Sequence, residues 1–211
     1  MALALPDRHF GEWAPTTYAD IAAAVTERRG AGRTLVLVDG SSGSGKTTFA
    51  LTLADALPGA GVVHTDDIAW NLHPIDWTDE LMSGVVRPWM DGVQVDYRPP
   101  GWITHGRPGS VTTTATDVLI IEGVGAGRHE LVPWACLVVW VQTPHAIARE
   151  RVLTRDIGID GDTRDEVAAF FENWAAAEVP FYLAERPWDR ADLVVDGSSD
   201  APDGAIRVVW R

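Results

Sequence analysis

The sequence predicts an α/β fold in which a parallel sheet carries helices on both faces. The first observation is a set of short apolar segments of strand length, such as RTLVLVD at 33–39 and CLVVWVQ at 136–142. Continuous apolar segments of this kind are typical of strands buried on both faces. The second observation is that these segments alternate along the chain with segments of helical periodicity. The length of 211 residues suits a single domain, 1–211.

Each predicted element follows from its pattern of apolar residues. Helices are predicted over residues 17–29, 45–57, 144–156 and 163–185. Strands are predicted over 33–39, 61–66, 117–123, 136–142 and 191–197, with an edge strand over 205–211. The segment 67–115 is rich in Trp, Pro and Gly, and we expect it to be an irregular excursion from the sheet.

Composition argues against several classes of partner. The net charge is −13 and no Lys/Arg-rich tract exists, so neither nucleic acid nor an anionic membrane surface is an expected partner. No apolar segment reaches the length of a membrane span and the N-terminus lacks a signal-peptide pattern, so we expect a cytoplasmic protein. The one cysteine, Cys136, lies in an apolar segment and is expected to be a buried thiol.

The strongest motif is GSSGSGKT at 40–47, which matches G-x-x-x-x-G-K-[ST] between a predicted strand and a predicted helix. Glycines let backbone N–H groups turn toward phosphate oxygens, and the helix N-terminus adds positive potential. Lys46 is expected to reach the β- and γ-phosphates, while the Thr47 hydroxyl binds Mg²⁺. The motif predicts a three-layer P-loop NTPase fold that uses ATP as co-substrate with Mg²⁺. The predicted nucleotide-binding residues are Gly40, Ser41, Ser42, Gly43, Ser44, Gly45, Lys46, Thr47 and Thr48.

Acidic residues follow two of the predicted strands, where ligands bind in parallel sheets. Asp66 and Asp67 close the segment VVHTDD, and either could accept a proton from an attacking hydroxyl and help to hold Mg²⁺. Asp66 is the preferred candidate because it lies nearer the strand end. Glu122 ends DVLIIEG, at the Walker-B position that serves Mg²⁺. The other reading of all three is a capping or solvated carboxylate.

Arginines in the segment ARERVLTRD suit a transferring phosphoryl group. Arg151 and Arg155 are four residues apart and share one helical face, where they could equally form solvated ion pairs. The glycine-bearing segment that follows is expected to form the turn of a lid over about 149–165, which would exclude water.

Planar and polar side chains gather in residues 67–107 and suit an acceptor pocket. Taken singly, each tryptophan there is more often part of a core. The residues assigned to the acceptor are Trp70, Tyr97, His105 and Arg107, together with Asp66.

The chain resembles the uridine kinase and phosphoribulokinase-like branch of P-loop kinases. The resemblance covers residues 34 to about 200 and includes GSSGSGKTT, DYRPPGWITHGRPGS, DVLIIEG, RVLTRD and RADLVVDG, in the family's order. It implies that Asp66 is the base and that Tyr97, His105 and Arg107 lie in the acceptor pocket. It also implies that Glu122 serves Mg²⁺ and that Arg151 and Arg155 belong to the lid.

The expected activity is therefore phosphoryl transfer from MgATP to a hydroxyl of a small molecule. No N-K-x-D or L-S-G-G-Q motif is present, which argues against a GTPase and a transporter-type ATPase. A pyrimidine nucleoside 5′-OH, as in uridine or cytidine, is the simplest acceptor; a sugar, pantothenate, a nucleotide or an antibiotic stays open. The alternative from another class is a regulatory ATP-binding NTPase. A homo-oligomer is also left open.

Overall fold

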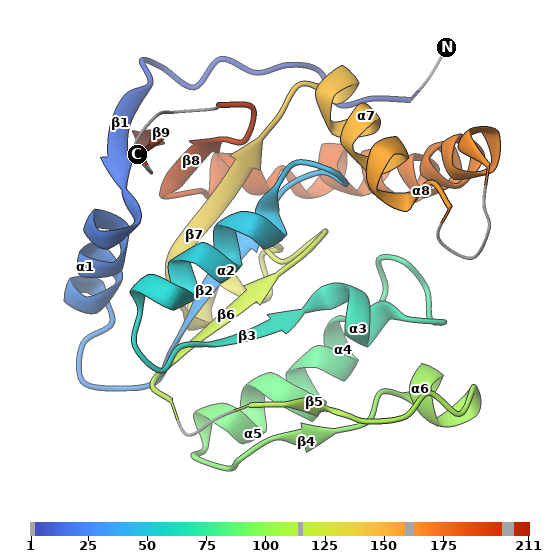
Figure 1. Ribbon diagram of the computed structural model, residues 1–211. Coiled ribbons are helices and arrows are strands. Elements are labelled where there is room, and N and C mark those ends of the chain that lie inside the picture. Colours follow the sequence, from blue (N-terminus) through green and yellow to red (C-terminus); the bar gives the residue numbers. More distant parts are fainter. Residues whose placement is uncertain (1–2, 114–115, 159–162, 200–204) are drawn as a thin grey trace.

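A seven-stranded sheet forms the centre of the computed structural model, which describes residues 3–113, 116–158, 163–199 and 205–211 (Figure 1). Five neighbouring strands are parallel; β9 is antiparallel to β8, and β1 is antiparallel to β9. In sheet order the strands are β1 (Ala14–Thr17), β9 (Ala205–Trp210), β8 (Leu193–Asp196), β7 (Ala135–Gln142), β2 (Thr34–Asp39), β6 (Val118–Glu122) and β3 (Gly61–His64). The predicted α/β fold with a mainly parallel sheet is confirmed.

Helices cover both faces of this sheet and produce three layers. On one face α1 (Tyr18–Arg28) and α2 (Lys46–Ala56) pack on Val36 and Val38, in one apolar cluster. Leu35 and Leu37 alternate with them and point into a second cluster on the other face. The C-terminal end of α8 (Arg164–Glu185) packs there against Trp140 of β7, as part of a third cluster. α7 (His145–Asp156) follows β7 and contacts α8.

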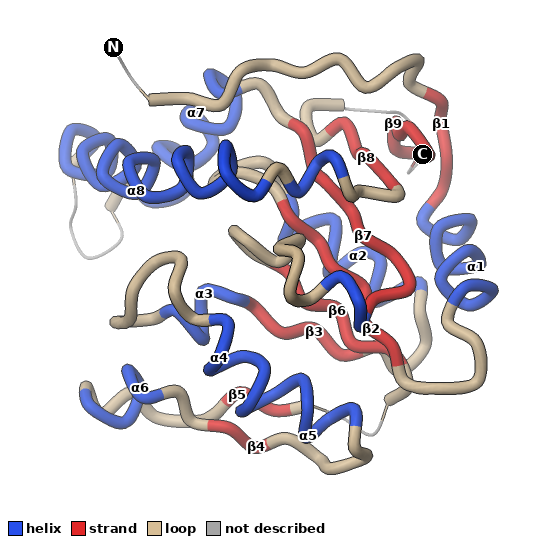
Figure 2. Tube along the Cα trace, turned by 180° about the vertical axis from the view of Figure 1, so that it is seen from behind, coloured by secondary structure: helices blue, strands red, loops and turns tan. Residues whose placement is uncertain are grey.

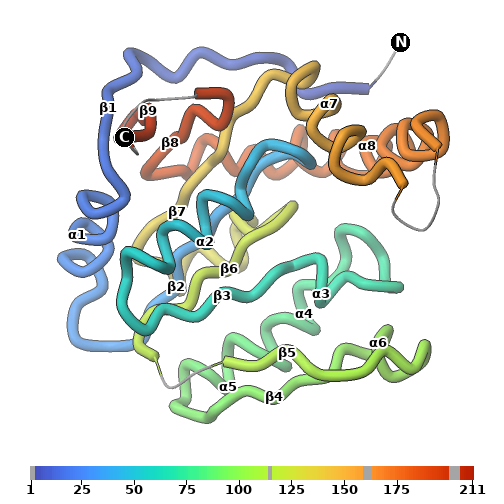
Figure 3. Tube along the Cα trace, viewed as in Figure 1, coloured from blue at the N-terminus to red at the C-terminus, as the bar shows by residue number. Residues whose placement is uncertain are grey.

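Two of the predicted helices begin with a capping box. Thr17 and Asp20 start α1, and Thr163 and Glu166 start α8, each with reciprocal side-chain and backbone bonds. The predicted and observed bounds of these two helices differ by at most one residue at each end. Figure 3 follows the N-terminal segment, in dark blue, across the top of the sheet from β1 toward α7.

The expectation that segment 67–115 is irregular was wrong for much of its length. Seen from behind in Figure 2, it packs beside β3 as short helices and a small two-stranded sheet. These elements are α3 (Thr65–Ala69), α4 (Thr78–Leu81), the π-helical turn η1 (Met82–Val86), α5 (Arg87–Met90), β4 (Asp96–Tyr97), α6 (Pro100–Thr104) and β5 (Val111–Thr112). Trp77, Trp89 and Trp102 are at most 5% exposed, because they supply the core between these helices and the sheet.

Three further expectations need correction. Segment 205–211 forms β9, but it is not an edge strand, since β1 pairs outside it. The strand predicted over 61–66 ends at His64, and Asp66 lies in the first turn of α3. Cys136 is only partly buried.

Two short 3₁₀ helices, η2 (Val132–Trp134) and η4 (Pro187–Asp189), complete the elements of the described residues. Among the described residues no helix is long and apolar enough to cross a membrane.

Candidate active site

The phosphate loop joins the end of β2 to the start of α2 and needs glycine at two positions. Gly43 and Gly45 have φ of 77° and 97°, in the left-handed region that disfavours other residues. A Cβ on Gly43 would lie 2.2 Å from the carbonyl oxygen of Ala148, so the loop packs directly against α7. Lys46 is the first residue of α2 and is 8% exposed, with Nζ 3.5 Å from the carbonyl oxygen of Ser41.

A buried carboxylate, Asp39, holds the start of this loop. It accepts hydrogen bonds from the backbone N–H groups of Gly40, Gly125 and Gly127 and from the Tyr182 hydroxyl, at 2.6–3.0 Å. Burial raises the pKa of Asp39, and these four donors counter part of that effect. The carboxylate therefore joins β2, the loop after β6 and α8 at one point.

Glu122 and Thr47 meet beside the loop. The Thr47 hydroxyl lies 3.1 and 3.2 Å from the two carboxylate oxygens of Glu122, and Glu122 is only 3% exposed. Nδ1 of His64, the last residue of β3, bonds the same carboxylate, and this bond raises the pKa of His64. A hydroxyl and a carboxylate oxygen in contact suit Mg²⁺, which prefers oxygen ligands. The residues present thus fit the metal that the phosphate loop implies.

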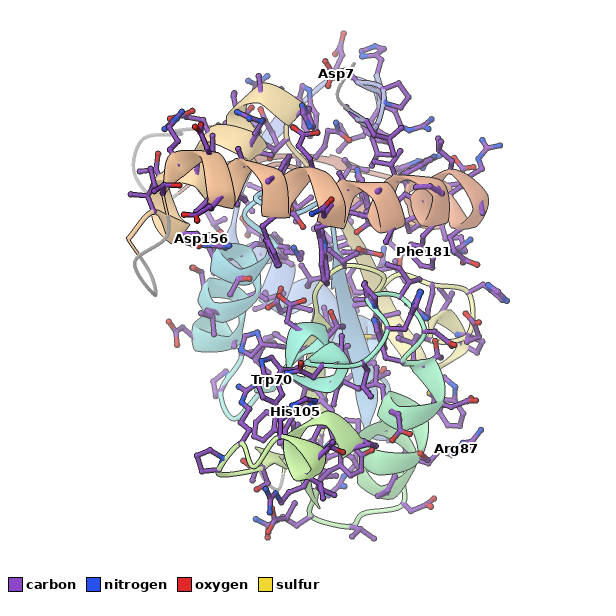
Figure 4. The ribbon with its side chains drawn as sticks, turned by 90° about the vertical axis from the view of Figure 1, so that its right-hand side faces the viewer. Asp7, Trp70, Arg87, His105, Asp156 and Phe181 are labelled. Carbon is purple, nitrogen blue, oxygen red and sulfur yellow. The ribbon has the colours of Figure 1, made fainter. Side chains whose placement is uncertain are left out.

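A hollow of about 410 Å³, here called the α3–α8 hollow, opens beside the loop. It contains Lys46 from the loop and Asp66 from α3. It is lined by Ser42, Lys46, Asp66, Ala69, Trp70, Asn71, Leu72, Val124, Val152, Arg155, Asp156, Phe170, Phe171 and Trp174. Figure 4 views this side of the molecule, with Trp70 below α8 and Asp156 near one end of that helix. Asp66 is exposed to solvent through this hollow.

The structure distinguishes Asp66 from its neighbour. The carboxylate of Asp67 bonds the guanidinium of Arg107 at 2.7 Å and is not among the residues that line the hollow. That guanidinium also lies 3.8 Å from the ring of Trp102. Arg107 therefore serves the packing between α3 and α6.

Two other predicted acceptor residues lie outside the α3–α8 hollow. The Tyr97 hydroxyl bonds Glu80, and its ring fills the space above Gly84, so the small β4–β5 sheet holds it against η1. His105 packs edge-on against Trp70, with ring centroids 5.8 Å apart. Figure 4 labels the two residues next to each other. Of the four assigned side chains in segment 67–115, only Trp70 lines the hollow.

The two predicted lid arginines lie at different places although they are one turn apart. Arg155 lines the α3–α8 hollow and is paired with Asp156. Arg151 donates to the carbonyl oxygen of Gly197 at 2.7 Å. Residues 159–162 of the predicted lid lie outside the described residues.

Arg151 borders a second hollow of about 370 Å³, here called the α2–β8 hollow. It is lined by Tyr18, Gly45, Thr48, Phe49, Val141, Arg151, Val195, Asp196, Gly197, Ser199 and Ile206. Gly45 and Thr48 belong to the phosphate loop and the first turn of α2. The same loop thus contacts two hollows through different residues.

No protein-family model matches the chain, and no curated protein sequence matches it. Solved structures do. A provisionally designated fructose transport system kinase from Silicibacter sp. TM1040 matches with TM-score 0.56 and 23% identity, covering 83% of this chain and 95% of its own. A provisionally designated uridine kinase from Bacillus stearothermophilus matches with TM-score 0.55 and 21% identity, covering 84% and 96%. The YGR205w protein matches with TM-score 0.58 and 13% identity, covering 93% and 99%.

The chain has an α/β P-loop NTPase fold. At these identities the structural likeness establishes the fold and leaves the chemistry to the residues of this chain. Within this fold the phosphate loop, Glu122 and Asp66 lie at the carboxyl ends of the parallel strands, as the sequence predicts.

The sequence analysis did not predict that α8 contributes side chains to the candidate site. Phe170, Phe171 and Trp174 line the α3–α8 hollow, although their spacing along the predicted helix is typical of a packed helix face. Phe170 is 64% exposed and stacks on Trp174, with ring centroids 6.4 Å apart. Glu178 was also missed. It falls on the buried face of α8, between Phe171 and Tyr182, and an acid at an apolar position was the available signal.

Proposed function

We propose that this protein is an ATP-dependent small-molecule kinase that transfers the γ-phosphoryl group of MgATP to a substrate hydroxyl. One observation carries the proposal: a single phosphate loop contacts two hollows, and one of them contains an exposed carboxylate beside the loop lysine. Phosphoryl transfer needs a donor and an acceptor site that share one phosphate position. A regulatory NTPase has no need of the second hollow.

ATP binding would use the loop and the α2–β8 hollow. The start of α2 would face the phosphates and Lys46 would supply positive charge, while the N–H groups of Gly40 and Ser42 donate to Asp39 and Glu178. Tyr18 and Phe49, with ring centroids 5.6 Å apart, give the α2–β8 hollow an aromatic border that suits the nucleoside part. Arg151 would lie beside it rather than at the transferred phosphate.

Thr47 and Glu122 are the residues that would hold Mg²⁺. The ion supplies neutralisation of phosphate charge when bound. His64 bonds Oε1 of Glu122, one of the two oxygens that the Thr47 hydroxyl contacts, and so helps to fix the orientation of the carboxylate.

Asp66 is the proposed base. It would accept the proton of the acceptor hydroxyl as that oxygen forms a bond to the γ-phosphorus, while the bond from that phosphorus to the ADP oxygen breaks. Lys46 and Arg155, which line the same hollow, would stabilise the charge on the transferred group.

The acceptor is proposed to be a neutral molecule with a planar or ring-shaped part and several hydroxyls, most simply a pyrimidine nucleoside used at its 5′-OH. Trp70 and Trp174 offer ring faces, while Asp66 and Asp156 offer acceptors for hydroxyl groups. A sugar, pantothenate, a nucleotide or an antibiotic belongs to the same reaction class. Segment 67–115 would contribute its first turn to this site, and the rest would support it; residues 149–165 would form the lid.

The test is ADP release by the purified protein with MgATP across a panel of nucleosides, nucleoside monophosphates, sugars, pantothenate and aminoglycosides. We expect turnover that depends on one class of acceptor, and the product mass identifies the hydroxyl. Binding of MgATP without turnover on any acceptor would contradict the kinase and favour the regulatory NTPase.

A further inference from the structure

Helix α8 carries a buried carboxylate, Glu178, that contacts the phosphate loop. The residue is 4% exposed. Its two oxygens lie 3.2 and 3.3 Å from the backbone nitrogen of Ser42, and Oε2 accepts a third hydrogen bond from the Ser42 hydroxyl at 2.8 Å. Ser42 is the third residue of the loop. A buried acid therefore directs both oxygens at a single residue of the nucleotide site.

The carboxylate borders a different cavity from the α3–α8 hollow. Glu178 lines a narrow cavity beneath residues 3–8 and Trp188, while the α3–α8 hollow is lined by Ser42 and Lys46 but not by Glu178. Ser42 lines both. Glu178 therefore contacts the loop at Ser42 without lining the α3–α8 hollow, which is the hollow proposed for the acceptor.

A buried acid at position 178 costs free energy of desolvation. Val167, Phe171 and Tyr182 share its buried helix face, and an apolar side chain at 178 would continue that face without desolvating a charge. Burial raises the pKa of Glu178, whereas Lys46 and the bonds from Ser42 act in the opposite direction. Both Ser42 groups are donors, and the carboxylate accepts from them with both of its oxygens and, when ionised, with a negative charge that an amide lacks.

We propose that Glu178 is a positioning residue that holds Ser42, and through it the phosphate loop, in the conformation that binds the phosphates of ATP. Tyr182, one turn later on α8, lies within hydrogen-bond distance of Asp39 and the carbonyl oxygen of Gly40. The same helix therefore holds the first and third residues of the loop. Trp174, one turn earlier, borders the α3–α8 hollow. This inference rests on the proposed function and deepens its ATP site.

The test is the dissociation constant for MgATP, measured calorimetrically without any acceptor on the wild-type protein and on two variants. Glu178→Asp keeps the charge but withdraws the carboxylate by one methylene. Glu178→Gln keeps the length but removes the charge and replaces one of the two acceptor oxygens with a donor. We expect each to weaken MgATP binding by roughly tenfold, as loss of one charge-assisted contact allows. Glu172→Gln is the matched control, since Glu172 lies on the same helix and pairs with Arg149 at the surface.

A double-mutant cycle separates positioning from general support of the fold. Ser42→Ala keeps the backbone N–H and removes the hydroxyl, so adding Glu178→Gln to Ser42→Ala should weaken binding by less than Glu178→Gln does alone. We also expect the Glu178→Gln variant to melt no lower than the wild type at pH 8, because it removes a buried charge.

The outcomes are distinct. A wild-type protein that does not bind MgATP contradicts the proposed function and this inference together. Wild-type binding with both Glu178 variants within twofold of it overturns this inference alone. Weaker binding that is independent of Ser42, accompanied by a lower melting temperature of both variants, also overturns it, because Glu178 would then act only through the fold.

Discussion

Asp66 and Asp67 are adjacent in sequence but have different surroundings. Asp66 faces the hollow that contains Lys46, and Asp67 is paired with Arg107. From the sequence alone either could be the base, since the choice depends on which way the first turn of α3 presents each side chain. Because β3 ends at His64, two residues earlier than predicted, both aspartates lie in the first turn of α3, and that helical turn sets the direction of each side chain.

We expect Asp66→Asn to leave MgATP binding within a few-fold of wild type and to reduce transfer by about 10²–10⁴-fold, the usual contribution of a general base. Asp67→Asn is the matched control, because it makes the same chemical change at the neighbouring position. Steady-state rates with the acceptor found in the panel, together with MgATP affinity, check this prediction. Loss of transfer in Asp67→Asn alone would assign the base to Asp67 instead.

The predicted site residues divide according to the kind of signal that identified them. The phosphate loop, Glu122 and Asp66 were found from local motifs at strand ends, and such motifs fix their own backbone geometry. Tyr97 and His105 were assigned through the resemblance and the aromatic composition of a long connection. Their positions depend on how α6 and β4 pack, which no local pattern determines.

At the scale of elements, α8 is the helix that connects the most parts of the candidate site. It begins after the predicted lid, borders the α3–α8 hollow, contacts the phosphate loop and ends beneath Trp188. Pro180 lies inside it and has no N–H to offer the carbonyl oxygen of Ala176. Tertiary contacts such as those of Tyr182 must therefore hold its second half.

We expect Tyr182→Phe to lower the free energy of unfolding by about 1.5–3 kcal/mol, because the hydroxyl bonds a buried carboxylate. Urea denaturation at pH 7.5 measures the change. A shift below about 0.5 kcal/mol would show that the three backbone N–H donors alone satisfy Asp39.

The raised pKa of Glu178 makes a pH prediction with a definite sign. A carboxyl whose pKa is higher in the folded protein contributes stability below its unfolded pKa of about 4.3, and this contribution is lost as the pH rises through the folded pKa. The stability of Glu178→Gln relative to wild type should therefore increase as the pH rises above about 4.3. Melting curves of both proteins across pH 4–8 check this; a constant difference would contradict it.

Among the elements, the strands buried on both faces were predictable because their sequences are continuously apolar. β1 was not, since its sequence APTT has no apolar run and it forms only because β9 offers a free edge. The short helices of segment 67–115 were missed for a similar reason. α3 and α6 are five residues long, which is too short for a periodic pattern. α4, η1 and α5 form one continuous helical stretch from Thr78 to Met90, but it contains Gly84 and Pro88, which disfavour a helix in sequence reading.

At the scale of the whole molecule, nucleotide binding should stabilise the fold by mass action. MgATP at about 100 times its dissociation constant adds about 2.7 kcal/mol, which for a chain of this length is a rise of about 5–10 °C in melting temperature. Lys46→Ala should remove most of this rise, because it removes the buried cation of the loop, and should abolish transfer. Differential scanning fluorimetry with and without MgATP makes the comparison. An equal rise in Lys46→Ala would place the nucleotide elsewhere.

The outer strand β1 has a consequence for how copies of this protein can associate. It is four residues long, largely exposed, and contains Pro15, which has no N–H to donate. Unpaired sheet edges are templates for strand addition, and a short strand with a proline is a poor template. Assembly by extending the sheet across β1 is therefore disfavoured, and concentrated solutions should not form cross-β aggregates from this edge. A stable contact between copies is therefore expected at a surface other than the β1 edge.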